Sequence, residues 1–273
     1  MKVFIVFLKI LFFSIPSCIT IIFLSSLYFE KEIAIMDQSK NNKKNVLITG
    51  GNSGIGLSLV KKYLSSGYHV IATYRTKTSP LNLNKFKSKN LETLHVDFIE
   101  KNSEKIILSF LGKRKIDIVI HNACYFPKNG NKAFDLSTED WLKAFKVNTI
   151  FPISLTAKMT KNLLKSPNPK VVFISSRRGS NYVNIKDSYI GRYEYRSTKS
   201  ALNSSVIALN DELKNLGILT LLIHPGRVAT KLTNFDGISP DESANNIFKL
   251  VEDLDSGLSG NFICSQSRNI LPW

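Results

Sequence analysis

The feature that most constrains the fold of this chain is an apolar run that turns through glycines into a helical pattern. Residues 45–49 are apolar and strand-like, Gly50, Gly54 and Gly56 follow, and residues 57–64 show the spacing of an amphipathic helix. Glycines permit a tight turn and a close approach of the backbone, and a helix that begins there offers free N–H groups to a phosphate. The segment predicts a phosphate-binding strand–turn–helix unit. Taken alone, it is also compatible with an ordinary strand–helix connection.

The same alternation of strand and helix patterns continues to the end of the chain. Strands are predicted near residues 45–49, 69–74, 91–97, 116–121, 170–175, 218–223 and 260–264. Helices are predicted over residues 54–66, 101–111, 138–162, 194–215 and 240–252. Strands that alternate with helices form a parallel sheet covered on both faces. The sequence predicts an α/β fold with a single doubly wound parallel sheet of the Rossmann type.

Several polar and glycine positions follow directly after predicted strands. Gly54, Asn122, Ser176 and Pro225 all fall just beyond the ends of such runs. Parallel sheets of this kind bind ligands beyond the carboxyl ends of their strands. We therefore expect these four residues to meet at one edge of the sheet.

Tyr195 and Lys199 stand four positions apart at the start of a predicted helix. Residues at this spacing project from one face of a helix. A cation beside a phenol favours the phenolate and draws a pKa of about 10 towards neutrality, where a proton donor works best. The pair predicts acid–base chemistry.

With these residues in order, the chain resembles the short-chain dehydrogenase/reductase family over residues 44–273. Further segments that resemble the family's pattern are His121-Asn122-Ala123-Cys124, Val147-Asn148-Thr149, Val171-Val172-Phe173-Ile174-Ser175-Ser176 and His224-Pro225-Gly226-Arg227-Val228-Ala229-Thr230. The resemblance is strongest to the branch of C-factor and the sniffer-type carbonyl reductases. It rests there on residues 175–180, on the stretch from Tyr195 to Asn203, and on the final Leu271-Pro272-Trp273.

The resemblance implies a catalytic set of Asn148, Ser176, Tyr195 and Lys199. Tyr195 would protonate a carbonyl oxygen, Lys199 would assist it and hold the cofactor ribose, Ser176 would bind the carbonyl, and Asn148 would support a water. Ser175 is the rival serine. The implied cofactor contacts are Gly50, Asn52, Ser53, Gly54, Ile55, Gly56, Arg75, Asp97, Phe98, Asn122, Ala123, Tyr195, Lys199, Pro225, Gly226, Val228 and Thr230.

The end of the second predicted strand favours NADP(H) over NAD(H). Tyr74 stands where a carboxylate would accept the ribose 2′-hydroxyl of NAD, and Arg75 follows it. A guanidinium can bind a 2′-phosphate that an acid would repel. The alternative is an arginine that only faces solvent.

Three departures from the family pattern bear on the site. Cys124 replaces the usual glycine, and Arg227 replaces a bulky aromatic, which could favour an anionic substrate. Ser176 and Tyr195 are nineteen positions apart, more than is usual. None of these departures removes a catalytic group.

The composition of the chain limits the kinds of ligand and partner that are expected. The net charge of +16 invites a nucleic-acid role, but the lysines are dispersed and form no basic stripe interleaved with aromatics. The three cysteines are too few and too scattered for a disulfide framework, and the four histidines lack ligand spacing, so no metal is expected. The expected partner is a small carbonyl compound; oligomeric state and substrate identity are not predicted.

Residues 1–35 form a separate apolar N-terminal segment. The stretch 10–29 is uncharged and long enough to cross a bilayer. Lysines follow it, and positive residues beside a membrane-spanning helix favour the cytoplasmic side, so the segment could anchor a cytoplasmic domain. Met36 is alternatively the true start. In both cases the catalytic domain is expected in the cytoplasm, with a membrane tether in the first.

The leading hypothesis is an NADPH-dependent oxidoreductase that transfers hydride between nicotinamide and a carbonyl or alcohol. The alternative is a membrane-associated regulatory protein of the C-factor type that binds the dinucleotide with little turnover, because fold and motif do not fix biological role. A nucleotide-sugar epimerase or dehydratase fits less well, because the chain is short for an added substrate domain.

Overall fold

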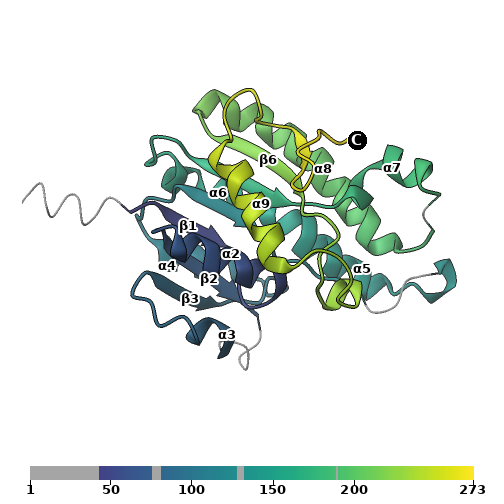
Figure 1. Ribbon diagram of the computed structural model, residues 1–273, viewed down its shortest axis with the longest axis horizontal. Coiled ribbons are helices and arrows are strands. Elements are labelled where there is room, and N and C mark those ends of the chain that lie inside the picture. Colours follow the sequence, from purple (N-terminus) through teal and green to yellow (C-terminus); the bar gives the residue numbers. More distant parts are fainter. Residues whose placement is uncertain (1–42, 76–80, 128–131, 189) are drawn as a thin grey trace, which may run out of the picture. The chain divides into compact units, whose positions relative to one another are not determined.

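The computed structural model describes residues 43–75, 81–127, 132–188 and 190–273. Residues 44–273 form one unit by their contacts, and its elements are shown in Figure 1. The predicted apolar segment 1–35 lies outside the described residues. Among the helices that are described, none combines the length and apolar character needed to span a bilayer.

Seven parallel strands form one sheet in the order β3-β2-β1-β4-β5-β6-β7. The strands are β1 (Asn45–Ile48), β2 (His69–Tyr74), β3 (Leu91–His95), β4 (Ile118–His121), β5 (Lys170–Ile174), β6 (Leu219–His224) and β7 (Phe262–Cys264). Each coincides with a predicted run to within a few residues. The order reverses between β1 and β4, so the topology is doubly wound and the expected Rossmann-type fold is confirmed.

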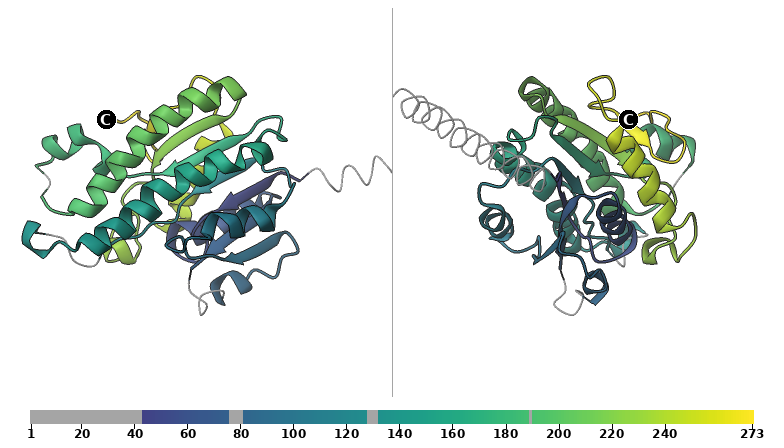
Figure 2. Two further views of the ribbon diagram at one scale, coloured as in Figure 1. Left: turned by 180° about the vertical axis from the view of Figure 1, so that it is seen from behind. Right: turned by 60° about the vertical axis from the view of Figure 1, so that its left-hand side comes forward.

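Helices cover both faces of this sheet because the strand residues alternate between two cores. In β1, Val46 and Ile48 join one apolar cluster while Leu47 joins the other. The first cluster packs under α2 (Gly54–Ser65) and α9 (Pro240–Glu252), which lie together in front of the sheet in Figure 1. The second packs under α4 (Ser103–Leu111), α6 (Phe151–Leu163) and α8 (Tyr193–Leu213). Figure 2 shows this second face, with α8 in green and α6 in teal.

The predicted helix 138–162 is interrupted, and this corrects the sequence interpretation. The segment consists of α5 (Thr138–Phe145), a π-helical turn η2 (Lys146–Ile150) and α6. Proline lacks the N–H that an α-helix needs four residues after each carbonyl, so Pro152 cannot pair with the carbonyl of Asn148. The α-helical pattern therefore fails at the turn that contains Asn148.

Short elements absent from the sequence prediction surround the carboxyl edge of the sheet or connect the strands. They are α3 (Leu81–Asn84), η1 (Ala133–Asp135), η3 (Arg177–Gly179), α7 (Asn181–Lys186), η4 (Lys214–Leu216) and η5 (Lys231–Thr233). Of these, η3 and α7 follow β5 directly and bring the segment after Ser176 back towards α8.

Candidate active site

The glycine turn between β1 and α2 is packed too closely for side chains. A Cβ on Gly56 would lie 2.1 Å from the Gly50 carbonyl oxygen and 2.5 Å from Asn122 Nδ2. Gly54 has a φ of 52°, in the left-handed region. Ser53 occupies the N-cap position of α2 without a side-chain capping hydrogen bond and is exposed, and Ile55 packs partly buried on the core. The turn thus presents backbone rather than side chains to a ligand.

Thr49 and Asn122 fix this turn to the end of β4. Thr49 Oγ1 accepts hydrogen bonds from the N–H groups of Asn122 (3.0 Å) and Ala123 (3.1 Å). Asn122 Nδ2 donates to the carbonyls of Thr49 (3.0 Å) and Gly50 (3.1 Å). Asn122 therefore shapes the glycine turn, and Thr49 belongs to the candidate site although the prediction left it out. Its place directly before Gly50 was the available signal.

The loop after β6 reaches the same turn. A Cβ on Gly54 would lie 3.2 Å from Cγ2 of Thr230. Val228 is buried and forms a bridge with Ile238, while the Pro225 carbonyl accepts a 2.8 Å hydrogen bond from Ser243. Two segments that are far apart in the sequence are thus in close contact at the glycine turn.

Tyr195 and Lys199 lie in the first turns of α8, on one face as predicted. The Lys199 Nζ lies 5.9 Å from the centroid of the Tyr195 ring and donates a 2.7 Å hydrogen bond to the Ile174 carbonyl at the end of β5. Lys199 is buried, and that burial lowers the pKa of its ammonium group. Phe126 meets the Tyr195 ring edge to face at 5.1 Å.

The two serines after β5 have different surroundings. Ser175 is buried and its hydroxyl donates a 2.6 Å hydrogen bond to Asn203 Oδ1 on α8. Ser176 Oγ accepts from the N–H of Arg178 at 3.1 Å. Because this contact uses Ser176 Oγ as an acceptor, its proton stays available to a ligand, whereas the Ser175 proton is committed to the core.

Asn148 joins three parts of the site. Its Oδ1 accepts from the N–H of Tyr125 (2.8 Å), and its Nδ2 donates to the Tyr125 carbonyl (2.9 Å) and to Thr198 Oγ1 (3.1 Å). The carboxamide thus fastens the segment after β4 to α8. No pattern in the sequence identified Thr198 or the backbone of Tyr125 as its partners.

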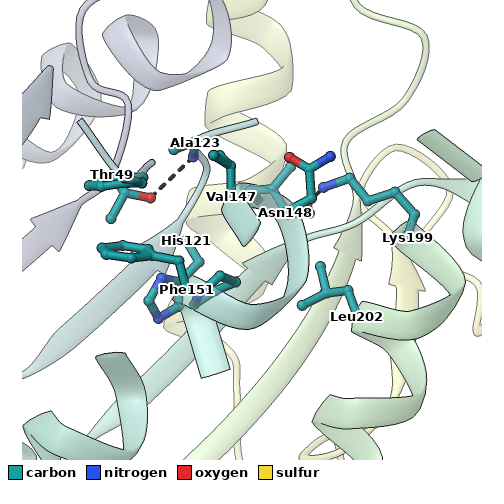
Figure 3. A pocket seen from close by; sticks show the side chains of 11 residues that line it. Thr49, His121, Ala123, Val147, Asn148, Phe151, Lys199 and Leu202 are labelled. Carbon is teal, nitrogen blue, oxygen red and sulfur yellow. Dashed lines mark hydrogen bonds between the residues drawn. The ribbon is translucent and has the colours of Figure 1, made fainter. Parts of the chain in front are cut away.

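A small cavity of about 10 Å³ lies between the sheet and the π turn, with room for about one water molecule. Figure 3 shows Thr49, His121, Asn148 and Lys199 around it. His121 stacks on Phe173 at 5.0 Å, and its Nε2 lies 2.8 Å from the Thr156 hydroxyl. That hydroxyl donates to the Pro152 carbonyl, so Nε2 of His121 carries the proton. Burial lowers the pKa of His121 to about 3.

The predicted adenosine contacts lie at the ends of β2 and β3. Arg75 is exposed immediately after β2, and Asp97 Oδ1 accepts from the N–H of Ile99 at 3.0 Å. The Asn52 carbonyl accepts a 3.3 Å hydrogen bond from Asn82. The Phe98 ring stacks on Phe151 at 3.8 Å in the core, so its side chain is turned away from this surface.

The two unusual residues of the sequence differ in their charge environment. Cys124 is exposed, with its Sγ 3.7 Å from the Tyr125 carbonyl. Arg227 is exposed and its Nε lies 2.6 Å from Asp236, so its charge is balanced within its own loop.

These residues fit a dinucleotide. The Gly50–Gly56 turn offers bare backbone at the N-terminus of α2, as a pyrophosphate requires, and the Tyr195 and Lys199 side chains lie along the same edge of the sheet.

Comparison with known proteins agrees with this geometry. Residues 44–238 match the short chain dehydrogenase family. C-signal of Myxococcus xanthus is 30% identical over 140 residues, which cover 51% of this chain and 82% of that protein. A carbonyl reductase from chicken fatty liver, solved with NADPH bound, superimposes with a TM-score of 0.77 and 25% identity over 85% of this chain and 99% of its own. Carbonyl reductase Sniffer of D. melanogaster shares the fold, with a TM-score of 0.76 and 24% identity over 85% of this chain and all of its own.

The chain therefore belongs to the short-chain dehydrogenase family and is an oxidoreductase of that family. The resemblance to C-factor and the sniffer-type carbonyl reductases, expected from residues 175–180 and 195–203, is confirmed by C-signal and Sniffer.

Proposed function

We propose that this protein is an NADPH-dependent reductase that converts a carbonyl compound to an alcohol, with Tyr195 as the proton donor. The observation that carries the proposal is that Lys199 and Asn148 connect β5 and the π turn to α8, the helix of Tyr195. Lys199 donates to the Ile174 carbonyl, two residues before Ser176, and Asn148 donates to Thr198. The Ser176 hydroxyl, the Tyr195 phenol and the Lys199 ammonium group are therefore held together by these hydrogen bonds.

Three side chains of the protein would take part in the reduction. NADPH, when bound, supplies the hydride for the carbonyl carbon. The Ser176 hydroxyl donates a hydrogen bond to the carbonyl oxygen, and Tyr195 gives that oxygen its proton. Lys199 stabilises the tyrosine oxygen as its proton leaves, because an ammonium group favours the anion.

Proton resupply would pass through the cavity beside the π turn. The carboxamide of Asn148 is used by Tyr125 and Thr198, so its backbone carbonyl is the better group to hold a water there. That carbonyl has no α-helical partner, since residue 152 is proline. Lys199 lines the same cavity. After its ammonium group has passed a proton to the Tyr195 oxygen, the neutral amine can take a proton from such a water, which recovers its own from solvent.

The reductase proposal is tested by following NADPH absorbance with a panel of aldehydes, ketones and quinones. Carbonyl-dependent oxidation is expected with at least one class of compound. Tight NADPH binding with no oxidation by any member of the panel would reject the reductase and favour the regulatory alternative.

The cofactor preference is a separate prediction, supported by Arg75 and by the NADPH-bound chicken reductase. A charge-assisted contact to a phosphate contributes about 1.5–3 kcal/mol, so Arg75→Ala should lose about tenfold to a hundredfold in NADPH affinity relative to NADH. Fluorescence titration of both cofactors measures this. Arg114→Ala, which removes an arginine paired with Glu92 on β3, is the control. Equal affinity of the unmodified protein for the two cofactors would contradict the assignment.

A further inference from the structure

Arg192 stands near the candidate proton donor, with its guanidinium group over an aromatic ring. Its guanidinium carbon lies 4.8 Å from the centroid of the Phe126 ring, and that ring lies 5.1 Å from the Tyr195 ring. In the part of the chain that the structure describes, none of the ion pairs involves Arg192. The Arg192 guanidinium group therefore packs on the face of the Phe126 ring, and the Phe126 ring in turn contacts the Tyr195 ring.

The backbone places this arginine at some cost. Arg192 has φ 57° and ψ 44°, the left-handed conformation, directly before the first residue of α8. Arginine has no local hydrogen bond to favour this region, in contrast to asparagine. Strained residues of this kind concentrate at functional sites.

The surroundings of Ser176 are also positive. Arg177 and Arg178 both bind the single carboxylate of Asp187, at 2.8 and 3.0 Å. Burial, together with the charges of these two arginines, lowers the pKa of His224 to about 4, so the imidazole adds no charge of its own at neutral pH. Across residues 176–196 there are four arginines and one lysine against two acids.

Arg227 differs from Arg192 in this respect, since Asp236 balances its charge. We propose that the substrate is a carbonyl compound that carries a carboxylate, and that Arg192 binds this carboxylate while the carbonyl faces Ser176 and Tyr195. The proposal rests on the proposed reductase function and names the class of its substrate. Phe126 would contact the apolar part between the two groups, because it lies between Arg192 and Tyr195.

The test uses two aldehydes that differ in one charge, 4-carboxybenzaldehyde and its methyl ester, methyl 4-formylbenzoate. The unmodified protein is expected to reduce the acid with a kcat/KM at least tenfold above that of the ester. Arg192→Asn, which suits the left-handed backbone, should lower kcat/KM for the acid at least tenfold more than for the ester, mainly through KM. Arg192→Lys should keep part of the preference for the acid over the ester, because lysine keeps the positive charge.

Arg268→Asn is the matched control. Arg268 also has a left-handed backbone, with φ 61°, but its guanidinium is paired with Asp253 at 2.7 Å. Its replacement should leave the preference for the acid unchanged. A preference that falls equally in both variants would assign the effect to the backbone and overturn the proposal.

A binding measurement separates this proposal from the reductase function. Calorimetric titration of the NADPH complex with 4-(hydroxymethyl)benzoate, the alcohol product, needs no turnover. We expect this acid to bind at least tenfold more weakly to Arg192→Asn. We also expect methyl 4-(hydroxymethyl)benzoate, the ester of the same alcohol, to bind much more weakly than the acid to the unmodified protein. If no member of the carbonyl panel is reduced, the proposed function fails, while this titration still decides the present proposal. Equal binding of acid and ester, or no effect of Arg192→Asn, would overturn it.

Discussion

At the scale of single residues, His121 links the site to the pH dependence of folding. The side chain is buried between Phe173 and Thr156, and its pKa is lowered to about 3. In the unfolded chain the pKa returns to about 6.5. Below that value the unfolded state binds a proton that the folded state does not, so stability is complete above pH 6.5 and is lost as the pH falls towards 3.

From pH 7 to pH 5, His121 should cost the folded state about 2 kcal/mol. Urea unfolding at both values measures this loss in the unmodified protein and in His121→Asn, which keeps a polar side chain but removes the group that titrates. The variant should show a smaller loss by about that amount. Equal losses in the two proteins would show that His121 is not a source of acid sensitivity.

At the scale of elements, the π turn between α5 and α6 determines where Asn148 sits. We expect Pro152→Ala to supply the missing N–H, to let the Asn148 carbonyl form an α-helical bond, and to shift the Asn148 carboxamide away from Tyr125 and Thr198. Turnover should fall at least tenfold, judged against a general acid–base contribution of about 10²–10⁴.

Pro240→Ala provides the control for this change, because Pro240 also opens a helix, α9, but lies outside the π turn. Steady-state kinetics and NADPH titration should show near-normal values for it. Normal turnover in Pro152→Ala would mean that packing, rather than the missing N–H, shapes the turn.

The elements also show what the sequence could and could not predict. All seven strands and the helix of Tyr195 and Lys199 follow from periodicity, because buried parallel strands need apolar runs and residues at i and i+4 share a helix face. The break at residues 146–150 was missed, although Pro152 was a visible signal. The partners of Asn148 and Ser175, namely Thr198 and Asn203, lie on a helix distant in sequence. Such pairs depend on how helices pack against the sheet, which local patterns do not encode.

At the scale of the whole molecule, the site and both cores lie within residues 44–273. We therefore expect a chain that begins at Met36 to express in soluble form and to bind NADPH, since every described strand and every candidate site residue lies after residue 43. Calorimetric titration with NADPH and a thermal unfolding curve check this. Aggregation, or loss of NADPH binding, would show that residues before Met36 belong to the fold.

The molecule as a whole is interpreted as an enzyme built around one proton donor, and that claim has a direct test. Tyr195→Phe removes only a hydroxyl, while Tyr193→Phe removes an equivalent hydroxyl from an exposed tyrosine two residues earlier on α8. For each protein, NADPH affinity and carbonyl-dependent NADPH oxidation are measured on the same sample. We predict that Tyr195→Phe loses about 10²–10⁴ in kcat with NADPH affinity near normal, and that Tyr193→Phe keeps both. Turnover by Tyr195→Phe at the rate of the unmodified protein would contradict the mechanism.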